Sequence, residues 1–99
     1  MIFYHATTPE QWVKYENEDY YAAESLDTEG FIHASFAEQV EPTLAIHFKG
    51  IKKILLLTID SDLLTSKLVV EASRNGELFP HIYGTINKSA IIDKQQKGS

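Results

Sequence analysis

Three of the four histidines stand two residues away from an aromatic residue, each in a segment whose composition favours a β-strand. The pairs are Phe3 with His5, Phe31 with His33, and His81 with Tyr83. Because residues i and i+2 lie on the same face of a strand, each imidazole should project beside an aromatic ring. If the three segments meet in the fold, they line an aromatic cleft. The alternative is that each histidine is half-buried in its own strand and bonded to a backbone carbonyl.

Other residue types exclude several kinds of site. There is no cysteine, which removes disulfides, thiolate metal sites and thiol nucleophiles. His5, His33, His81 and Glu71 could ligate a metal, but no histidine pair has the short spacing of a preorganised site, so we expect none. Ser35 lacks the glycines of a nucleophile elbow and forms a helix capping-box pattern with Glu38. The five glycines are isolated, so no phosphate-binding loop is expected.

The charge and length of the chain narrow the classes of partner. The 99 residues carry a formal net charge of -5, whereas nucleic-acid-binding proteins need a surplus of bases, so no nucleic-acid partner is expected. Nine acids and one base precede Pro42, and the rest of the chain is mildly basic, which is compatible with a small nucleotide-like ligand. No segment has the length of a membrane span, and no targeting segment is recognisable. We expect a soluble, cytoplasmic protein; the sequence leaves its oligomeric state open.

Hydropathy and turn signals predict one α+β domain over residues 1–93 and a polar tail that frays over residues 94–99. About six short, mostly antiparallel strands and two or three short helices are expected. Strands are predicted over 2–6, 20–25, 31–34, 53–59, 67–72 and 90–92, and helices from 9 through 15, for one turn after 35, and over 41–48. The nearly continuous apolar run over 53–59 predicts a central strand covered on both faces. Trp12 and His47 are assigned to packing.

Three longer motifs resemble those of a known family. They are Tyr4-His5-Ala6-Thr7, Gly30-Phe31-Ile32-His33-Ala34-Ser35-Phe36 followed by Gln39, and Glu71 followed by Phe79-Pro80-His81-Ile82-Tyr83-Gly84. Through them nearly the whole chain resembles the bacterial domain-of-unknown-function family 952, whose name carries no activity. That family is in turn similar to the small ADP-ribosyltransferase-like fold. His5-Ala6-Thr7 resembles the His-Gly-Thr with which poly(ADP-ribose) polymerases and RNA 2′-phosphotransferases hold the ribose of NAD, and the segment 31–35 resembles the Val-His-Leu-Ser strand of the latter.

The resemblance implies NAD as a ligand and a role for each matched residue. His33 and Glu71 would be catalytic, with Glu77 as the alternative to Glu71. The ligand-binding residues would be His5, Thr7, Phe31, Ser35, Gln39, Phe79, His81 and Tyr83. The chain departs from the pattern at Ala6, where glycine is usual, and has no tyrosine at the second position. Its single arginine, Arg74, argues against RNA 2′-phosphate transfer.

These residue types suit chemistry at the ribose of NAD. Loss of nicotinamide passes through an oxocarbenium-like centre, which requires donors for the ribose hydroxyls, aromatic surfaces and nearby negative charge. Imidazoles, aromatic rings and Glu71 provide these groups. We therefore expect binding of NAD or a related nucleotide phosphate, with transfer or hydrolysis of ADP-ribose as the reaction. The alternatives are a non-catalytic ligand-binding or protein-interaction module and, less favoured, a metal-dependent enzyme.

Overall fold

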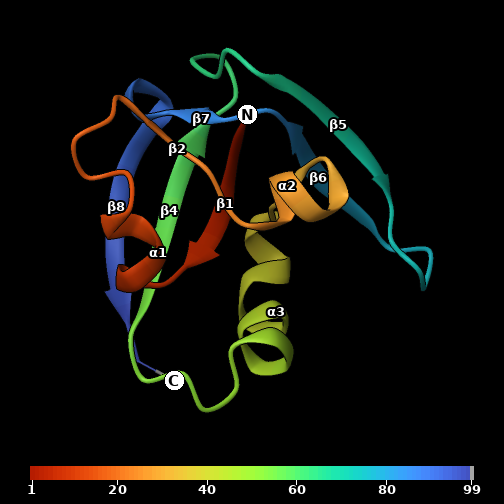
Figure 1. Ribbon diagram of the computed structural model, residues 1–99. Coiled ribbons are helices and arrows are strands. Elements are labelled where there is room, and N and C mark those ends of the chain that lie inside the picture. The colour runs from red at the N-terminus through yellow and green to blue at the C-terminus, as the bar shows by residue number, and fades with distance from the viewer. Residues whose placement is uncertain (99) are drawn as a thin grey trace.

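The computed structural model describes residues 1–98 and arranges eight strands in three antiparallel sheets, with three α-helices at the periphery (Figure 1). The strands are β1 (Ile2–Thr7), β2 (Tyr20–Tyr21), β3 (Ile32–His33), β4 (Ile54–Asp60), β5 (Lys67–Ala72), β6 (Leu78–Tyr83), β7 (Ile86–Asn87) and β8 (Ile91–Lys97). The α-helices are α1 (Pro9–Val13), α2 (Ser25–Glu29) and α3 (Val40–His47), and single 3-10 turns cover Ala37–Gln39 and Lys88–Ala90. The strand orders are β1-β4-β8, β2-β7 and β3-β6-β5. A small α+β domain with mostly antiparallel strands, as predicted, is confirmed.

The predicted central strand is confirmed, because β4 lies between β1 and β8. One side of it contributes Leu57 and Ile59 to the main core, which the three sheets enclose together. The other side contributes Ile54 and Leu56 to a second cluster, where they meet α3. Burial on both sides explains why nearly every residue of this strand is apolar.

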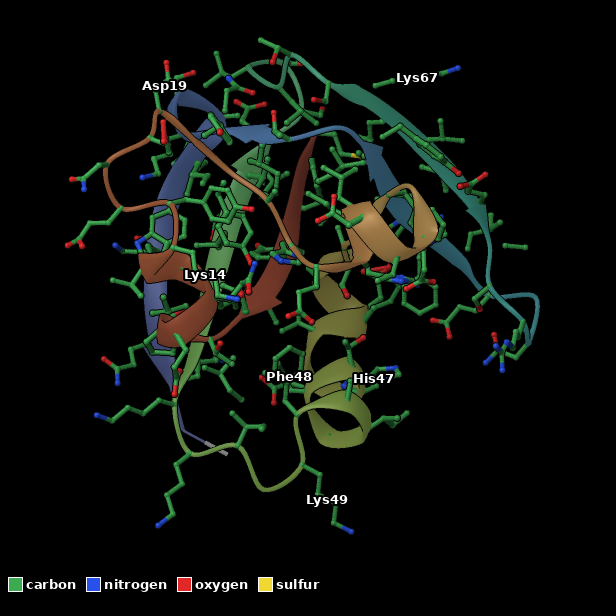
Figure 2. All side chains as sticks on the ribbon, viewed as in Figure 1. Lys14, Asp19, His47, Phe48, Lys49 and Lys67 are labelled. Carbon is green, nitrogen blue, oxygen red and sulfur yellow. The ribbon has the colours of Figure 1, made fainter. Side chains whose placement is uncertain are left out.

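Helix α3 packs on the sheet through apolar residues at every fourth position, a spacing that places them on one face of a helix. Val40 and Leu44 are buried against Ile54 and Leu56, and Phe48 packs at the edge of the same cluster. Figure 2 shows Phe48 on the side of α3 toward β1. The assignment of His47 to packing was wrong: its side chain is exposed, because the position before Phe48 turns away from the stripe.

The first predicted helix forms but is shorter than expected. Thr8 is its N-cap, accepting a hydrogen bond from the Gln11 N–H at 3.2 Å, and Pro9 occupies the first helical position. Trp12 is partly buried and packs against the main core, as assigned. The helix ends at Val13, before Tyr15.

A second helix replaces part of a predicted strand. The segment expected to extend over residues 20–25 pairs only at Tyr20–Tyr21, and α2 begins at Ser25. Gly30 ends α2 with φ +88°, a conformation that glycine adopts without steric cost. The helix brings Glu29 next to the following strand.

The predicted fraying of the polar tail was wrong over the described residues. β8 continues through Lys97, and its Gln95 and Gln96 pair with Leu56 and Leu55 of β4. An edge strand needs only backbone hydrogen bonds on its inner side, so exposed polar side chains do not prevent pairing. Ser99 lies outside the described residues.

The β5–β6 hairpin closes at Asn75-Gly76, a residue pair that favours a tight turn. The Ser73 N–H donates to the Glu77 carbonyl at 2.8 Å, and Gly76 has φ +86°. β6 is the middle strand of its sheet and β5 is an edge strand (Figure 1). No helix within residues 1–98 is long and apolar enough to cross a membrane.

Candidate functional site

The alternation of side chains along β3 and β6 separates a core face from a histidine-bearing face. Ile32 pairs with Ile82, and both side chains are fully buried in the main core. His33 pairs with His81, so the two imidazoles project together on the opposite face of the sheet. Strand pairing thus brings together two histidines that are 48 positions apart in the sequence.

Aromatic rings surround the two imidazoles. Phe31 stacks on His81 with a centroid distance of 4.2 Å and an interplanar angle of 22°. His33 lies edge-on to His81 at 5.5 Å and to Phe31 at 4.9 Å. Tyr83 completes the group, at 5.5 Å from Phe31. With Glu71 of the neighbouring strand, these residues are here called the imidazole face.

Glu71 is the charged centre of the imidazole face. One of its oxygens, Oε1, accepts hydrogen bonds from His81 Nδ1 at 2.8 Å and from the Tyr83 hydroxyl. The bond from Tyr83, followed by that from His81, lowers the pKa of Glu71 below its ordinary value of 4.5, while the Glu71 carboxylate raises the pKa of Tyr83. Since a carboxylate only accepts, Nδ1 of His81 carries the proton, and a neutral His81 has a free lone pair on Nε2.

Glu29 is a member of this neighbourhood that the sequence reasoning missed. Its Oε2 lies 3.0 Å from Nε2 of His33, and both side chains are about half exposed. The i, i+4 spacing of Glu29 and His33 was a visible signal, but it is informative only if a helix leads into β3. The sequence instead predicts strands over 20–25 and 31–34 with no helix between them.

His5 does not join the imidazole face. It is buried, and its Nδ1 donates to the backbone carbonyl of His33 at 2.6 Å, so it contacts the strand rather than the neighbouring imidazole. Burial lowers the pKa of His5 from 6.5 to about 4, which keeps the ring neutral at pH 7. Its other nitrogen, Nε2, has no hydrogen-bond partner among the described residues. The predicted convergence of three histidines is therefore correct for His33 and His81 and wrong for His5.

His5 borders a separate open pocket of about 370 Å³. Thr7, also a predicted ligand-binding residue, lies here and shares a 2.6 Å hydrogen bond with the buried hydroxyl of Tyr21. Gln11 and Lys14 of the α1 region line the same pocket. The sheet thus places His5 and Thr7 together, but not with His33 and Glu71.

Ser35 and Gln39 have roles within the fold. Ser35 exchanges two backbone hydrogen bonds with Tyr4 at 2.7 and 2.8 Å, and its hydroxyl lies 3.4 Å from that of Thr43. It is not the N-cap that was predicted, because that position belongs to Phe36. Gln39 is buried and fully bonded: Oε1 accepts from the Phe36 N–H, and Nε2 donates to the Leu78 carbonyl and to Glu77.

The choice between Glu71 and Glu77 is settled in favour of Glu71 as the acid beside the histidines. Glu77 is exposed in the hairpin turn and bonds Gln39. Phe79 pairs directly with Glu71 and therefore lies on the histidine-bearing face as well. Within residues 1–98 no group of three histidine or acidic side chains has the arrangement of a metal site.

Solved structures of another protein have the same fold over nearly the whole of this chain. The crystal structure of protein CC0527 from Caulobacter crescentus superposes with a TM-score of 0.87 at 28% identity, covering 97% of this chain and 85% of that chain. A crystal structure of its double mutant gives a TM-score of 0.87 at 27% identity, with the same coverage. Its solution NMR structure gives 0.76 at 26% identity, covering 95% and 82%.

The comparison with protein families identifies the family of the chain. No curated protein matches the sequence. The family model described as protein of unknown function DUF952 matches residues 6–94, which include Thr7, the imidazole face and all of the β5–β6 hairpin. The chain therefore belongs to the DUF952 family.

Proposed function

We propose that this chain binds NAD or a related nucleotide-phosphate ligand at the imidazole face. The observation that carries the proposal is the Glu71 carboxylate, which His81 and Tyr83 hold by hydrogen bonds beside the stacked rings of Phe31 and His81. An ionised acid next to aromatic surfaces suits a flat, positively charged nicotinamide ring and the ribose attached to it. The resemblance of the motifs to the ADP-ribosyltransferase-like fold supports the same ligand.

The proposed reaction is transfer or hydrolysis of ADP-ribose. The bond between ribose C1′ and the nicotinamide nitrogen breaks, and nicotinamide leaves with the electron pair. The carboxylate of Glu71 stabilises the cationic ribosyl centre that remains. A water or acceptor hydroxyl then attacks C1′ and transfers its proton to the free lone pair of His81 Nε2. His33 donates a hydrogen bond to the ribose, and Phe31 and Phe79 hold the rings.

In this proposal, four of the residues predicted to bind ligand support the fold around the imidazole face instead. They are His5, Thr7, Ser35 and Gln39. The bond from His5 to the carbonyl of His33 fixes β3, so His5 is a positioning residue for His33. Gln39 anchors the start of β6 through the Leu78 carbonyl. Thr7 and Ser35 support β1 and its junction with β3.

A second function, ligand binding without turnover, is favoured by one observation. The His33 side chain is 55% exposed and that of Glu29 is 50% exposed, so the imidazole face is open to water. Enzymes that form an oxocarbenium-like centre usually exclude water from it unless water is the acceptor. A module that binds ADP-ribose or a nucleotide phosphate needs no such exclusion.

One set of measurements tests the proposal and separates the two functions. NMR spectra are recorded while NAD, ADP-ribose and nicotinamide are added, and released nicotinamide is then quantified by chromatography over hours. Shifts at His33, His81 and Tyr83 with NAD support binding, and absence of shifts with every ligand overturns it. Release that Glu71→Gln abolishes without loss of binding establishes the enzyme; binding without release establishes the module. Glu77→Gln, a change of the same size on the same hairpin, is the matched control and should leave both unchanged.

A further inference from the structure

Strand β5 has a free edge along its whole length. It pairs with β6 on one side, and no other strand pairs with it in the described part of the chain. Figure 1 shows it at the margin of the molecule, with no ribbon along its outer side. The outward-pointing N–H and C=O groups of a free edge are a template for another strand.

The sequence of β5 does not discourage such pairing. Its Leu68-Val69-Val70 segment is apolar, and Val70 is 44% exposed. Free edges are commonly protected by prolines or by charged residues in mid-strand, and β5 has neither. The other two long edge strands in the described residues differ from β5: β8 has Asp93, Lys94 and Lys97 among mostly exposed polar residues, and Tyr4 of β1 exchanges two backbone hydrogen bonds with Ser35. Among these edges, β5 therefore combines an apolar centre with an outer side that pairs with no strand in the described residues.

Pairing of β5 with a second copy of itself is restricted to a few registers. In an antiparallel pair, two residues opposite one another either both direct their N–H and C=O groups toward the partner strand or both direct them away from it. When a strand pairs with a copy of itself, the two-fold axis must therefore pass between two identical residues. With the axis at Val69, Lys67 of each copy lies opposite Glu71 of the other, and Leu68 lies opposite Val70. With the axis at Val70, Glu71 lies opposite Val69 and no charges are matched. Opposite charges directly across a pair of strands are favourable, which selects the axis at Val69.

We propose that two copies of this chain associate through β5, antiparallel and in the register that places Val69 opposite Val69. The two three-stranded sheets become one six-stranded sheet. The exposed side of Val70 is covered by Leu68 of the partner subunit, and each end of the paired segment has a Lys67–Glu71 ion pair between subunits. The paired segment is short compared with a standard interface, so the dimer is weak and its population depends on concentration.

The dimer brings a cation to the imidazole face from the partner subunit. Residues opposite one another project from the same face of a sheet, so Lys67 of the partner subunit lies beside Glu71 on the side that carries His81 and Tyr83. Within one copy, Lys67 is opposite Tyr83 at the start of β5, and Figure 2 shows it directed away from the body of the molecule. Each imidazole face would then have two lysines near it, which suits a phosphate-bearing ligand.

The absence of cysteine makes the register directly testable by oxidation of single-cysteine variants. In the proposed register the Cα atoms of residue 69 are roughly 5 Å apart, within the range of a disulfide, whereas those of residue 70 are separated by more than about 7 Å. Val69→Cys should form a covalent dimer at least about tenfold faster than Val70→Cys under mild oxidation. Val70 is exposed and Val69 is half-buried, so accessibility alone predicts the opposite order. Equal rates, or faster cross-linking through Val70→Cys, overturn the proposed register.

Sedimentation equilibrium of the unmodified protein tests association itself. The mean mass should rise from one copy toward two as the concentration increases, and a mass of one copy at the highest concentration reached overturns the dimer. Lys67→Glu places like charges opposite one another at both ends and should shift the association to higher concentration. Lys49→Glu is the matched control: it makes the same change of charge at an exposed residue just after α3, at the opposite end of the molecule from Lys67 in Figure 2, and should have no effect. The outcome is independent of NAD binding, since no ligand is present.

Discussion

The Glu71 carboxylate accepts a hydrogen bond from His81 Nδ1 at 2.8 Å across the β5–β6 pair. The two residues are not opposite one another: Glu71 pairs with Phe79, and Val69 pairs with His81. The carboxylate therefore extends along the sheet to reach the imidazole, where Tyr83 bonds the same oxygen. This diagonal contact makes one acid the common partner of two side chains that sequence spacing alone does not connect with it.

Replacement of Glu71 by Gln should make the stability of the protein less dependent on pH in the acidic range. The pKa of Glu71 is lowered in the folded state, first by Tyr83 and then by His81. Its contribution to stability is therefore complete above the ordinary pKa of 4.5 and is lost as the pH falls through the lower, folded-state pKa. Urea unfolding of both proteins as a function of pH checks this. A constant difference between them across that range would contradict it.

His5 should destabilise the protein increasingly as the pH falls from 6.5 toward 4. Burial lowers the pKa of His5 to about 4 in the folded state, so the unfolded chain binds the proton first. Above pH 6.5 the histidine is neutral in both states and does not lower the free energy of unfolding. Below pH 4 it is protonated in both states, and the free energy of unfolding is lower by a constant amount of about 3 kcal/mol, since each tenfold change in proton affinity is about 1.4 kcal/mol. The free energy of unfolding of the normal protein and of His5→Gln, measured over this range, tests the assignment. The variant should lack this component of the pH dependence, and an identical pH profile would refute it.

Gln39→Leu should lower the free energy of unfolding by about 1–3 kcal/mol, because it removes the buried amide of Gln39 and leaves the Phe36 N–H and the Leu78 carbonyl without their partner. The exposed neighbour Glu38 provides the control, and Glu38→Gln should change stability by less than about 0.5 kcal/mol. Chemical denaturation measures both. If Gln39→Leu instead weakened NAD binding while stability stayed normal, Gln39 would be a ligand-binding residue rather than an anchor of β6.

Truncation after Asp93 should destabilise the protein, even though the removed residues are polar. Gln95 and Gln96 pair with Leu56 and Leu55, so their loss leaves the inner strand β4 with exposed backbone groups. Hydrogen exchange of the β4 amides should accelerate in the truncated chain, while exchange in the β5–β6 hairpin stays the same. Unchanged protection of β4 would show that the last residues are dispensable.

The elements that depend on local chemistry could be predicted from the sequence. The N-cap at Thr8 with Pro9, the turn at Asn75-Gly76 and the apolar stripe of α3 each arise from residues close in the chain. The central strand was also predictable, because a strand covered on both faces must be apolar at nearly every position. α2 and the full length of β8 were missed, since a short polar helix and a polar edge strand are stabilised by contacts elsewhere in the fold.

The candidate site, like the fold, could be predicted from the sequence only in part. The sequence alone determined which residues could do chemistry: three histidines spaced two residues from an aromatic ring, two candidate acids, and no cysteine. Only the tertiary structure decided which of them meet. Strand pairing aligned His33 with His81 and brought Glu71 rather than Glu77 to them. The antiparallel bridge between Tyr4 and Ser35 instead places β1 so that the ring of His5 bonds the backbone carbonyl of His33. The register of strands distant in the chain depends on the packing of the whole core, and no local pattern contains that information.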